Sequence, residues 1–244
     1  MSRPYEELDH AQTRLGELIL RRRRGPSLQG VDIYEVKLDG RFLMSSVVNA
    51  SEVALAHLGL APLHAPELDV VVGGLGLGCT AAAALDDPRV RSLAVIEALP
   101  QVIGWHRRGL VPLGARLAAD PRCELVEADF FALAATSLQG DAPPRPVHAV
   151  LLDIDHSPRG LLHEAHAAFY EPAGLAGLAA RLHPGGVFAL WSADPPDEAF
   201  TARLAAAFGS AQAHAVEFLN PLLDADEVNT VYVAQTAPGS PRND

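Results

Sequence analysis

The chain has 244 residues, of which 49% are hydrophobic, and this length suits one α/β domain with a small appendage. Its formal net charge of −11 argues against general nucleic-acid binding and is compatible with a cationic substrate. Two cysteines give no disulfide framework, and no apolar run approaches the roughly 20 residues that span a membrane. The charged N-terminus lacks an apolar signal core. We expect a cytoplasmic protein that binds neither nucleic acid nor membrane.

Residues 1–62 are expected to form a small N-terminal subdomain of one helix and a β-hairpin. An amphipathic helix is predicted over residues 4–20, because four apolar residues fall near one helical face: Leu8, Leu15, Leu18 and Ile19. The run from Arg21 to Arg24 fits either a solvated helix end or a phosphate or partner site.

The hairpin of this subdomain is predicted from an alternating pattern. Residues 31–38 alternate apolar and polar side chains, Asp39-Gly40 is typical of a tight turn, and residues 41–44 return. A helix from about residue 49 to 60 leads to the main domain.

Residues 63–236 alternate between predicted strands and helices, and residues 237–244 are expected to be a disordered tail. Strands are expected near residues 68–73, 92–97, 123–126, 147–153 and 185–192. Helices are expected near residues 78–86, 100–118, 130–138, 161–182 and 196–208. Two last strands, 212–219 and 228–235, are predicted to pair antiparallel at the sheet edge. This order resembles the α/β class I methyltransferase (Rossmann-like) fold, a mostly parallel sheet with a terminal antiparallel hairpin.

A glycine-rich turn follows the first strand of the main domain. Residues 70–78 read VVVGGLGLG, and a helix-forming run follows them. Glycine allows a sharp turn there and lets a ligand approach bare backbone, while the N–H groups at the helix start point towards it. Gly74, Gly76 and Gly78 are therefore candidate ligand-binding residues.

Acidic residues end three of the following strands. Glu97 lies 19 residues after Gly78, Asp129 follows the third strand, and Asp153 and Asp155 end the fourth. Parallel strands deliver their carboxyl ends to one edge of a sheet, where ligands of open α/β folds bind. A carboxylate such as Glu97 accepts hydrogen bonds from both ribose hydroxyls. The sequence thus predicts a nucleoside site at this edge.

Several motifs together resemble the spermidine/spermine synthase family over about residues 30–235. Leu38-Asp39-Gly40 is similar to the family's LDG turn, and residues 73–78 lie where the family has GGGDGG. The segment LDIDHSP, residues 152–158, resembles the TDxxDP strand end, and LHPGGV, residues 182–187, resembles the LxPGG turn.

The resemblance implies roles for the acids. Glu97 would bind the ribose, Asp129 would accept a hydrogen bond from the adenine amino group, and Phe130 would lie against the adenine ring. Asp153 would orient and deprotonate an attacking amine, with Asp155 and His156 as second candidates. The implied donor is decarboxylated S-adenosylmethionine, the acceptor a small amine or polyamine, and the assembly a homodimer.

The sequence departs from the family at two places. Gly76 stands where the family's Asp holds the donor amine, and residues 51–53 stand where Tyr-His-Glu shapes the polyamine pocket. Without that Asp, intact S-adenosylmethionine also fits, and with it a small-molecule methyltransferase. Two further alternatives remain: an NAD-dependent enzyme, since Gly76-x-Gly78-x-x-Ala81 fits GxGxxA, and a non-catalytic family member.

Two other features remain open in the sequence. Trp191, at the end of the fifth strand, fits either the acceptor pocket or the core. His163 and His166 have the i,i+3 spacing of a shared helical face, but the spacing supplies no third ligand, so no metal site is predicted.

Overall fold

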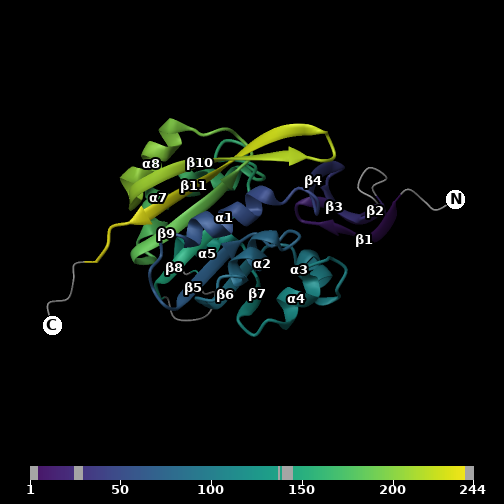
Figure 1. Ribbon diagram of the computed structural model, residues 1–244, viewed down its shortest axis with the longest axis horizontal. Helices are drawn as coiled ribbons and strands as arrows, with labels where there is room; N and C mark the ends of the chain where they lie inside the picture. The colour runs from purple at the N-terminus through teal and green to yellow at the C-terminus, as the bar shows by residue number, and fades with distance from the viewer. Residues whose placement is uncertain (1–4, 25–29, 137, 139–144, 240–244) are drawn as a thin grey trace.

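The chain folds into two β-sheets with helices on both faces of the larger one (Figure 1). This computed structural model describes residues 5–24, 30–136, 138 and 145–239. The smaller sheet is antiparallel, with the order β1-β2-β3-β4. Its strands are β1 (Glu6–Thr13), β2 (Gly16–Arg24), β3 (Asp32–Leu38) and β4 (Arg41–Ser45).

The larger sheet has seven strands in the order β10-β11-β9-β8-β5-β6-β7. They are β5 (Leu68–Gly73), β6 (Val90–Glu97), β7 (Cys123–Glu127), β8 (Val147–Leu152), β9 (Leu182–Ser192), β10 (Gly209–Asn220) and β11 (Ala225–Thr236). Strands β5 to β9 are parallel, whereas β11 is antiparallel to both β9 and β10. This confirms the predicted parallel sheet with an antiparallel end, which a dinucleotide-binding Rossmann sheet does not have.

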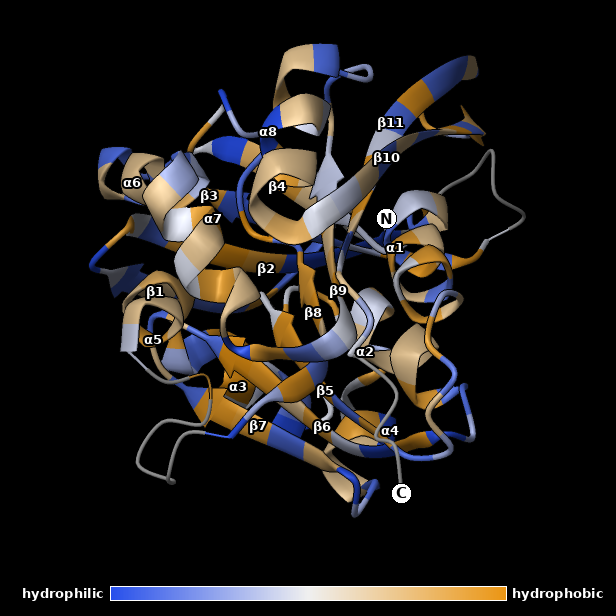
Figure 2. Ribbon diagram, turned by 90° about the vertical axis from the view of Figure 1, so that its left-hand side faces the viewer, coloured by the Kyte–Doolittle hydropathy of each residue, from blue (hydrophilic) through white to orange (hydrophobic). Residues whose placement is uncertain are grey.

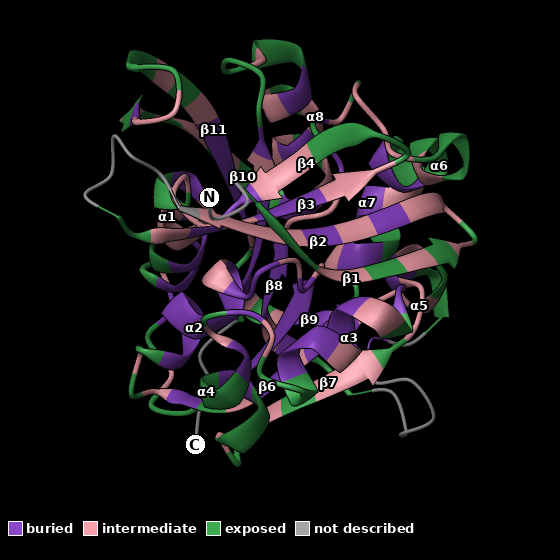
Figure 3. Cartoon of the chain, turned by 90° about the vertical axis from the view of Figure 1, so that its right-hand side faces the viewer, coloured by how far each residue is buried: buried purple, intermediate pink, exposed green. Residues whose placement is uncertain are grey.

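The β-branched run of β5 explains its central place. All six residues of β5 are buried, as expected for a strand covered on both faces. Val70 and Val72 belong to one hydrophobic cluster and Val71 to the other, because successive side chains of a strand point to opposite faces. Figure 2 shows the hydrophobic colouring of β5 and β8, and Figure 3 shows that the inner strands are buried.

Helices cover the two faces of this sheet separately. Those that contact one face are α1 (Ala50–Leu60), α2 (Cys79–Leu85), α3 (Pro100–Arg107) and α4 (Gly114–Ala119). Those of the other hydrophobic cluster are α5 (Phe130–Thr136), α6 (Ala167–Tyr170), α7 (Pro172–Ala179) and α8 (Glu198–Phe208). A 3₁₀ turn, η2 (Glu164–His166), precedes α6. The helix predicted over 100–118 is thus two, and so is most of the one predicted over 161–182.

The helix predicted over residues 4–20 is wrong, because this segment forms β1 and part of β2. Gly16 has φ of +115°, which turns the chain between the two strands. Leu18 and Leu20 alternate inward and lie opposite Leu38 and Val36 of β3. A few leucines satisfied both the helical and the alternating period, and pairing with the hairpin selected the strand.

The run from Arg21 to Arg24 is therefore not a helix end. Arg21 and Arg23 lie on one face of β2, and each donates to the buried carboxylate of Glu35 at 2.6 Å. Arg22 points to the other face and donates to Glu6 at 2.6 Å. Alternation along a strand, rather than helical spacing, decides the partners of these side chains.

Two further expectations concern membrane-spanning helices and the C-terminal tail. None of the described helices is both long and apolar enough to cross a membrane. Most of the tail predicted to be disordered, residues 240–244, lies outside the described residues.

Candidate functional site

The glycine-rich turn between β5 and α2 adopts a backbone that side chains would obstruct. Gly74 has φ of +93°, and a Cβ atom there would lie 2.1 Å from the carbonyl oxygen of Asp153. Gly78 has φ of +90° and stands at the N-cap of α2. The turn therefore brings bare backbone to the edge of the sheet beside the end of β8.

Glu97, at the end of β6, is tied to this turn. One carboxylate oxygen accepts from the backbone N–H of Leu75 at 3.1 Å, and the other accepts from that of Leu99 at 2.8 Å. Burial raises the pKa of Glu97 despite these hydrogen bonds. These hydrogen bonds hold both carboxylate oxygens beside the glycine-rich turn.

Asp129 and Phe130 lie beside Glu97 at the start of α5. The carboxylate of Asp129 accepts from the backbone N–H groups of Phe131 at 2.9 Å and Ala132 at 3.3 Å, which caps the helix. The ring of Phe130 is buried, with edge contacts to Phe131 and Phe169, so most of it belongs to the core.

Two cavities meet at the carboxyl ends of the central strands. The glycine-loop cavity, of about 540 Å³, is lined by Gly74, Gly76, Glu97, Asp129 and Phe130 together with residues of the N-terminal sheet. The Trp191 cavity, of about 570 Å³, lies between α1, β4 and the β10–β11 hairpin. Five residues line both cavities: Leu43, Met44, Gly76, Asp153 and Ile154.

Asp153 is the one carboxylate among these shared residues, and it faces a second acid. Burial raises the pKa of Asp153 to about 6, although Thr80 donates to its Oδ2 at 2.8 Å. Burial, followed by repulsion from Asp153, raises the pKa of Glu52 to about 7. Two buried carboxyl groups of this kind favour a bound cation, because a positive charge relieves both burial and repulsion.

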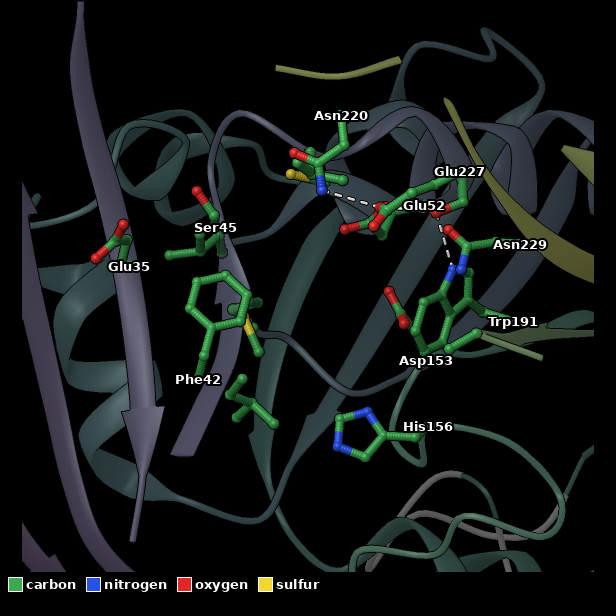
Figure 4. Close-up of a pocket in the computed structure, with 18 of the residues that line it drawn as sticks. Glu35, Phe42, Ser45, Glu52, Asp153, His156, Trp191, Asn220, Glu227 and Asn229 are labelled. Atoms are coloured by element: carbon green, nitrogen blue, oxygen red, sulfur yellow. Dashed lines mark hydrogen bonds between the residues drawn. The ribbon is translucent and has the colours of Figure 1, made fainter. Parts of the chain in front are cut away.

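Polar and aromatic groups surround the rest of the Trp191 cavity (Figure 4). Trp191 donates from Nε1 to the hydroxyl of Ser51 at 2.9 Å, and its side chain both lines this cavity and packs against the hydrophobic core. Glu227 accepts from Asn220 at 2.9 Å. The exposed His156 also lines this cavity, so the structure brings Asp153 and His156 to the same cavity.

Asp155 is placed differently from its neighbours. It is 1% exposed, lines neither cavity, and accepts from Leu162, His166 and Tyr170. With its acceptor positions filled by protein donors, it does not reach a substrate in either cavity. We therefore correct the expectation of a catalytic role for Asp155.

Gly76 lies next to two side chains that the sequence did not indicate. A Cβ atom on Gly76 would lie 2.9 Å from Sδ of Met44, on β4. On the other side, His106 is fully buried and its Nε2 lies 2.9 Å from the carbonyl oxygen of Gly76. A side chain at position 76 would therefore meet the thioether of Met44.

Sequence reasoning missed three residues of the site: Met44, Glu52 and Glu227. Only Glu52 had a signal, since it falls in the segment aligned with Tyr-His-Glu. Met44 and Glu227 lie in two hairpins, β3–β4 and β10–β11, and local patterns do not encode how these hairpins pack against the glycine-rich turn. No group of three potential metal ligands occurs among the described residues.

Comparison with known proteins places this geometry in a known fold. No family model matches the chain. Spermidine synthase from Thermotoga maritima superimposes with a TM-score of 0.72 at 17% identity, covering 96% of this chain and 74% of that chain. A spermidine synthase in complex with the transition state analogue AdoDATO gives 0.71 at 17% identity, covering 96% and 73%.

A third structure is that of a methyltransferase-like protein. Human methyltransferase-like protein 13, in complex with SAH, gives a TM-score of 0.57 at 22% identity, covering 79% of this chain and 84% of that chain. At these identities the comparisons show the fold. The chain has the fold of spermidine synthases, built on a class I methyltransferase-like domain, which confirms the predicted fold class.

Proposed function

We propose that the chain is a transferase that moves an alkyl group from a sulfonium nucleoside to a small amine. The first candidate reaction is aminopropyl transfer to a diamine or polyamine. The observation that carries the proposal is the place of Asp153. It lies where the cavity that would hold the nucleoside meets a cavity that contains three further carboxylates: Glu52, Glu227 and Glu35, the last of which is paired with Arg21 and Arg23.

The chemistry needs little from the protein beyond positions and one proton acceptor. A sulfonium activates its own carbon, so the amine nitrogen forms the new C–N bond while the C–S electron pair returns to sulfur. An amine reaches the site as an ammonium ion, which Asp153 and Glu52 attract. Asp153 then takes the proton that the nitrogen must lose before it attacks.

The nucleoside would be held by the glycine-loop cavity. Gly74 and Gly76 admit it close to backbone, Glu97 accepts from the ribose hydroxyls, and Asp129 accepts from the purine amino group. His156 is the second candidate base, on the acceptor side. Structures of the same fold that contain AdoDATO or SAH, a spermidine synthase and a methyltransferase-like protein, support a ligand of this class.

Methyl transfer from S-adenosylmethionine is the second candidate, and Gly76 favours it. No carboxylate stands on the glycine loop to bind the terminal ammonium of an aminopropyl donor, and Met44 fills that space. A donor that carries its own carboxylate meets no repulsion there.

The test is calorimetric titration with S-adenosylmethionine, its decarboxylated form, methylthioadenosine and NAD, followed by mass spectrometry of amines incubated with each donor. We expect the sulfonium nucleosides and methylthioadenosine to bind, NAD not to bind, and one amine to gain an aminopropyl group. A gained methyl group would establish the second candidate instead. Binding of NAD alone would contradict both, and binding of no nucleoside would favour a non-catalytic protein.

A further inference from the structure

The glycine-loop cavity contains a histidine that the proposed roles leave unused. His166, at the end of η2, lines this cavity together with Glu97 and Asp129. Its ring stacks on Phe131, with 3.8 Å between ring centroids and 22° between the ring planes. Its side chain is 15% exposed, so the ring is held in the wall and presents only part of its edge.

Asp155 fixes the orientation of this ring. Nδ1 of His166 lies 2.8 Å and 3.1 Å from the two carboxylate oxygens. Asp155 is itself held by the backbone N–H of Leu162 at 2.7 Å and by the hydroxyl of Tyr170 at 2.9 Å. Burial and the charge of Asp155 raise the pKa of Tyr170, so its hydroxyl remains a donor. Stacking and hydrogen bonds together prevent the imidazole from turning.

The same contact decides which nitrogen is free. A carboxylate accepts hydrogen bonds, so Nδ1 is the ring nitrogen that carries a hydrogen, and a neutral ring then has its lone pair on Nε2. Nε2 lies on the ring edge away from the buried Asp155. Within residues 5–24, 30–136, 138 and 145–239, no group forms a hydrogen bond with it. The cavity wall therefore presents an oriented acceptor with no protein partner.

We propose that Nε2 of His166 accepts a hydrogen bond from the exocyclic amino group of the purine and so selects a 6-amino purine over a 6-oxo purine. This assignment rests on the proposed function, because it concerns the nucleoside of the same cavity. His166 acts as a specificity-determining residue, with Asp155 as the residue that positions it.

The selectivity follows from counting donors and acceptors. The amino group of adenine has two hydrogens, which suit two acceptors, His166 and Asp129. Hypoxanthine has a carbonyl oxygen at that position. This oxygen is a hydrogen-bond acceptor and would face two other acceptors, His166 and Asp129. An unmatched polar group in an enclosed site lowers affinity strongly, by about tenfold or more.

The experiment compares methylthioadenosine with methylthioinosine by calorimetric titration of the full chain. Wild-type protein should prefer the adenine nucleoside by about tenfold or more. His166→Phe keeps an aromatic ring on Phe131 but removes the acceptor. It should weaken methylthioadenosine binding about tenfold and leave methylthioinosine binding within about twofold.

Two further variants separate recognition from structure. His166→Gln retains an N–H group for Asp155 and an oxygen for the purine, so it should keep most of the preference. His166→Leu removes the acceptor by a second route, so the outcome does not depend on one variant folding. The matched control is His163→Asn, because His163 lines the same cavity but accepts from the N–H of Ala165 as a local cap, which Asn can replace.

An unchanged adenine-to-hypoxanthine ratio in His166→Phe and His166→Leu would overturn the assignment, as would an equal loss of both nucleosides. In that result the wild type still binds methylthioadenosine, so the proposed function stands. If the wild type binds neither nucleoside, both proposals fail.

Discussion

At the scale of single residues, the proposed chemistry depends on the pair formed by Asp153 and Glu52. Both pKa values are raised by burial, to about 6 and about 7. Folding therefore disfavours the ionised pair. The resulting cost to stability is absent below the unfolded-state pKa values near 4, grows as the pH rises from about 4 to about 7, and is constant above that. A bound ammonium group would offset this cost, so the pair would favour binding of the proposed amine acceptor.

We expect Asp153→Asn to lower the rate of amine transfer by about a hundredfold or more, because the proton acceptor is lost. The same substitution removes a buried charge, so the midpoint of thermal unfolding at pH 8 should not fall. It should also reduce the gain in stability that the wild type shows when the pH is lowered from 8 to 5. Product formation and thermal melts at the two pH values measure these effects.

The matched control is Asp194→Asn, an exposed acid near the same sheet edge that lines neither the glycine-loop cavity nor the Trp191 cavity. It should leave the rate within about twofold, as usual for surface substitutions. Full activity in Asp153→Asn would remove Asp153 from the mechanism.

At the scale of elements, the turn between β5 and α2 is the part that tolerates least change. Its glycines have positive φ, and the carbonyl oxygen of Asp153 lies where a side chain on Gly74 would begin. The turn and the end of β8 therefore hold each other in position. The cavity beside them keeps its shape only if neither moves.

Gly74→Ala should destabilise the protein by about 1–3 kcal/mol and weaken methylthioadenosine binding, because the strained backbone and the clash with Asp153 both displace the turn. Chemical denaturation and calorimetric titration measure the two effects.

Gly177→Ala is the matched control, since this exposed glycine lies within helix α7 and a Cβ atom there meets nothing within 4 Å. Alanine favours the helix, so this variant should be more stable by about 0.5–1 kcal/mol with unchanged binding. Equal behaviour of the two variants would contradict the role given to the turn.

At the scale of the whole molecule, the N-terminal sheet closes a site that the larger sheet only begins. Leu18 and Val36 belong to the same hydrophobic cluster as Leu99 and Val102 on the α3 side. Asp9 of β1 accepts from Nε1 of the buried Trp105 at 2.5 Å and from Arg108 at 2.7 Å. These contacts join the two sheets, and residues of both line the glycine-loop cavity.

Asp9→Ala should cost about 1–3 kcal/mol of stability, because the buried indole N–H of Trp105 loses its acceptor. For a chain of this size that corresponds to roughly 2–4 °C in melting temperature for each kcal/mol. Methylthioadenosine affinity should fall while the adenine-to-hypoxanthine preference stays, since Asp9 touches neither His166 nor Asp129.

Glu7→Ala on the same strand is the control, because this side chain is half exposed and lies 3.8 Å from the similarly exposed His10. It should change the melting temperature little. Unchanged stability in Asp9→Ala would show that the contact with α3 does not hold the sheets together.

Local patterns in the sequence determined the main sheet, its glycine turn, its antiparallel end and the acids at its strand ends. They did so because alternating apolar runs, glycines and turn residues act over a few neighbouring positions. The resemblance to spermidine synthases then predicted the fold that the structural comparisons confirm.

Tertiary structure alone decided the rest. It made residues 6–24 two strands, since pairing with β3 outweighed a helical pattern of leucines. Asp155 lies outside both cavities, and His166 lies in the wall of the glycine-loop cavity. Hydrogen bonds join Asp155 to His166 and Tyr170, which are 11 and 15 positions further along the chain, and hold these side chains in place. Tertiary structure also brought Met44, Glu52 and Glu227 to the site from β4, α1 and β11, and contacts between such distant segments leave no mark in any short stretch of sequence.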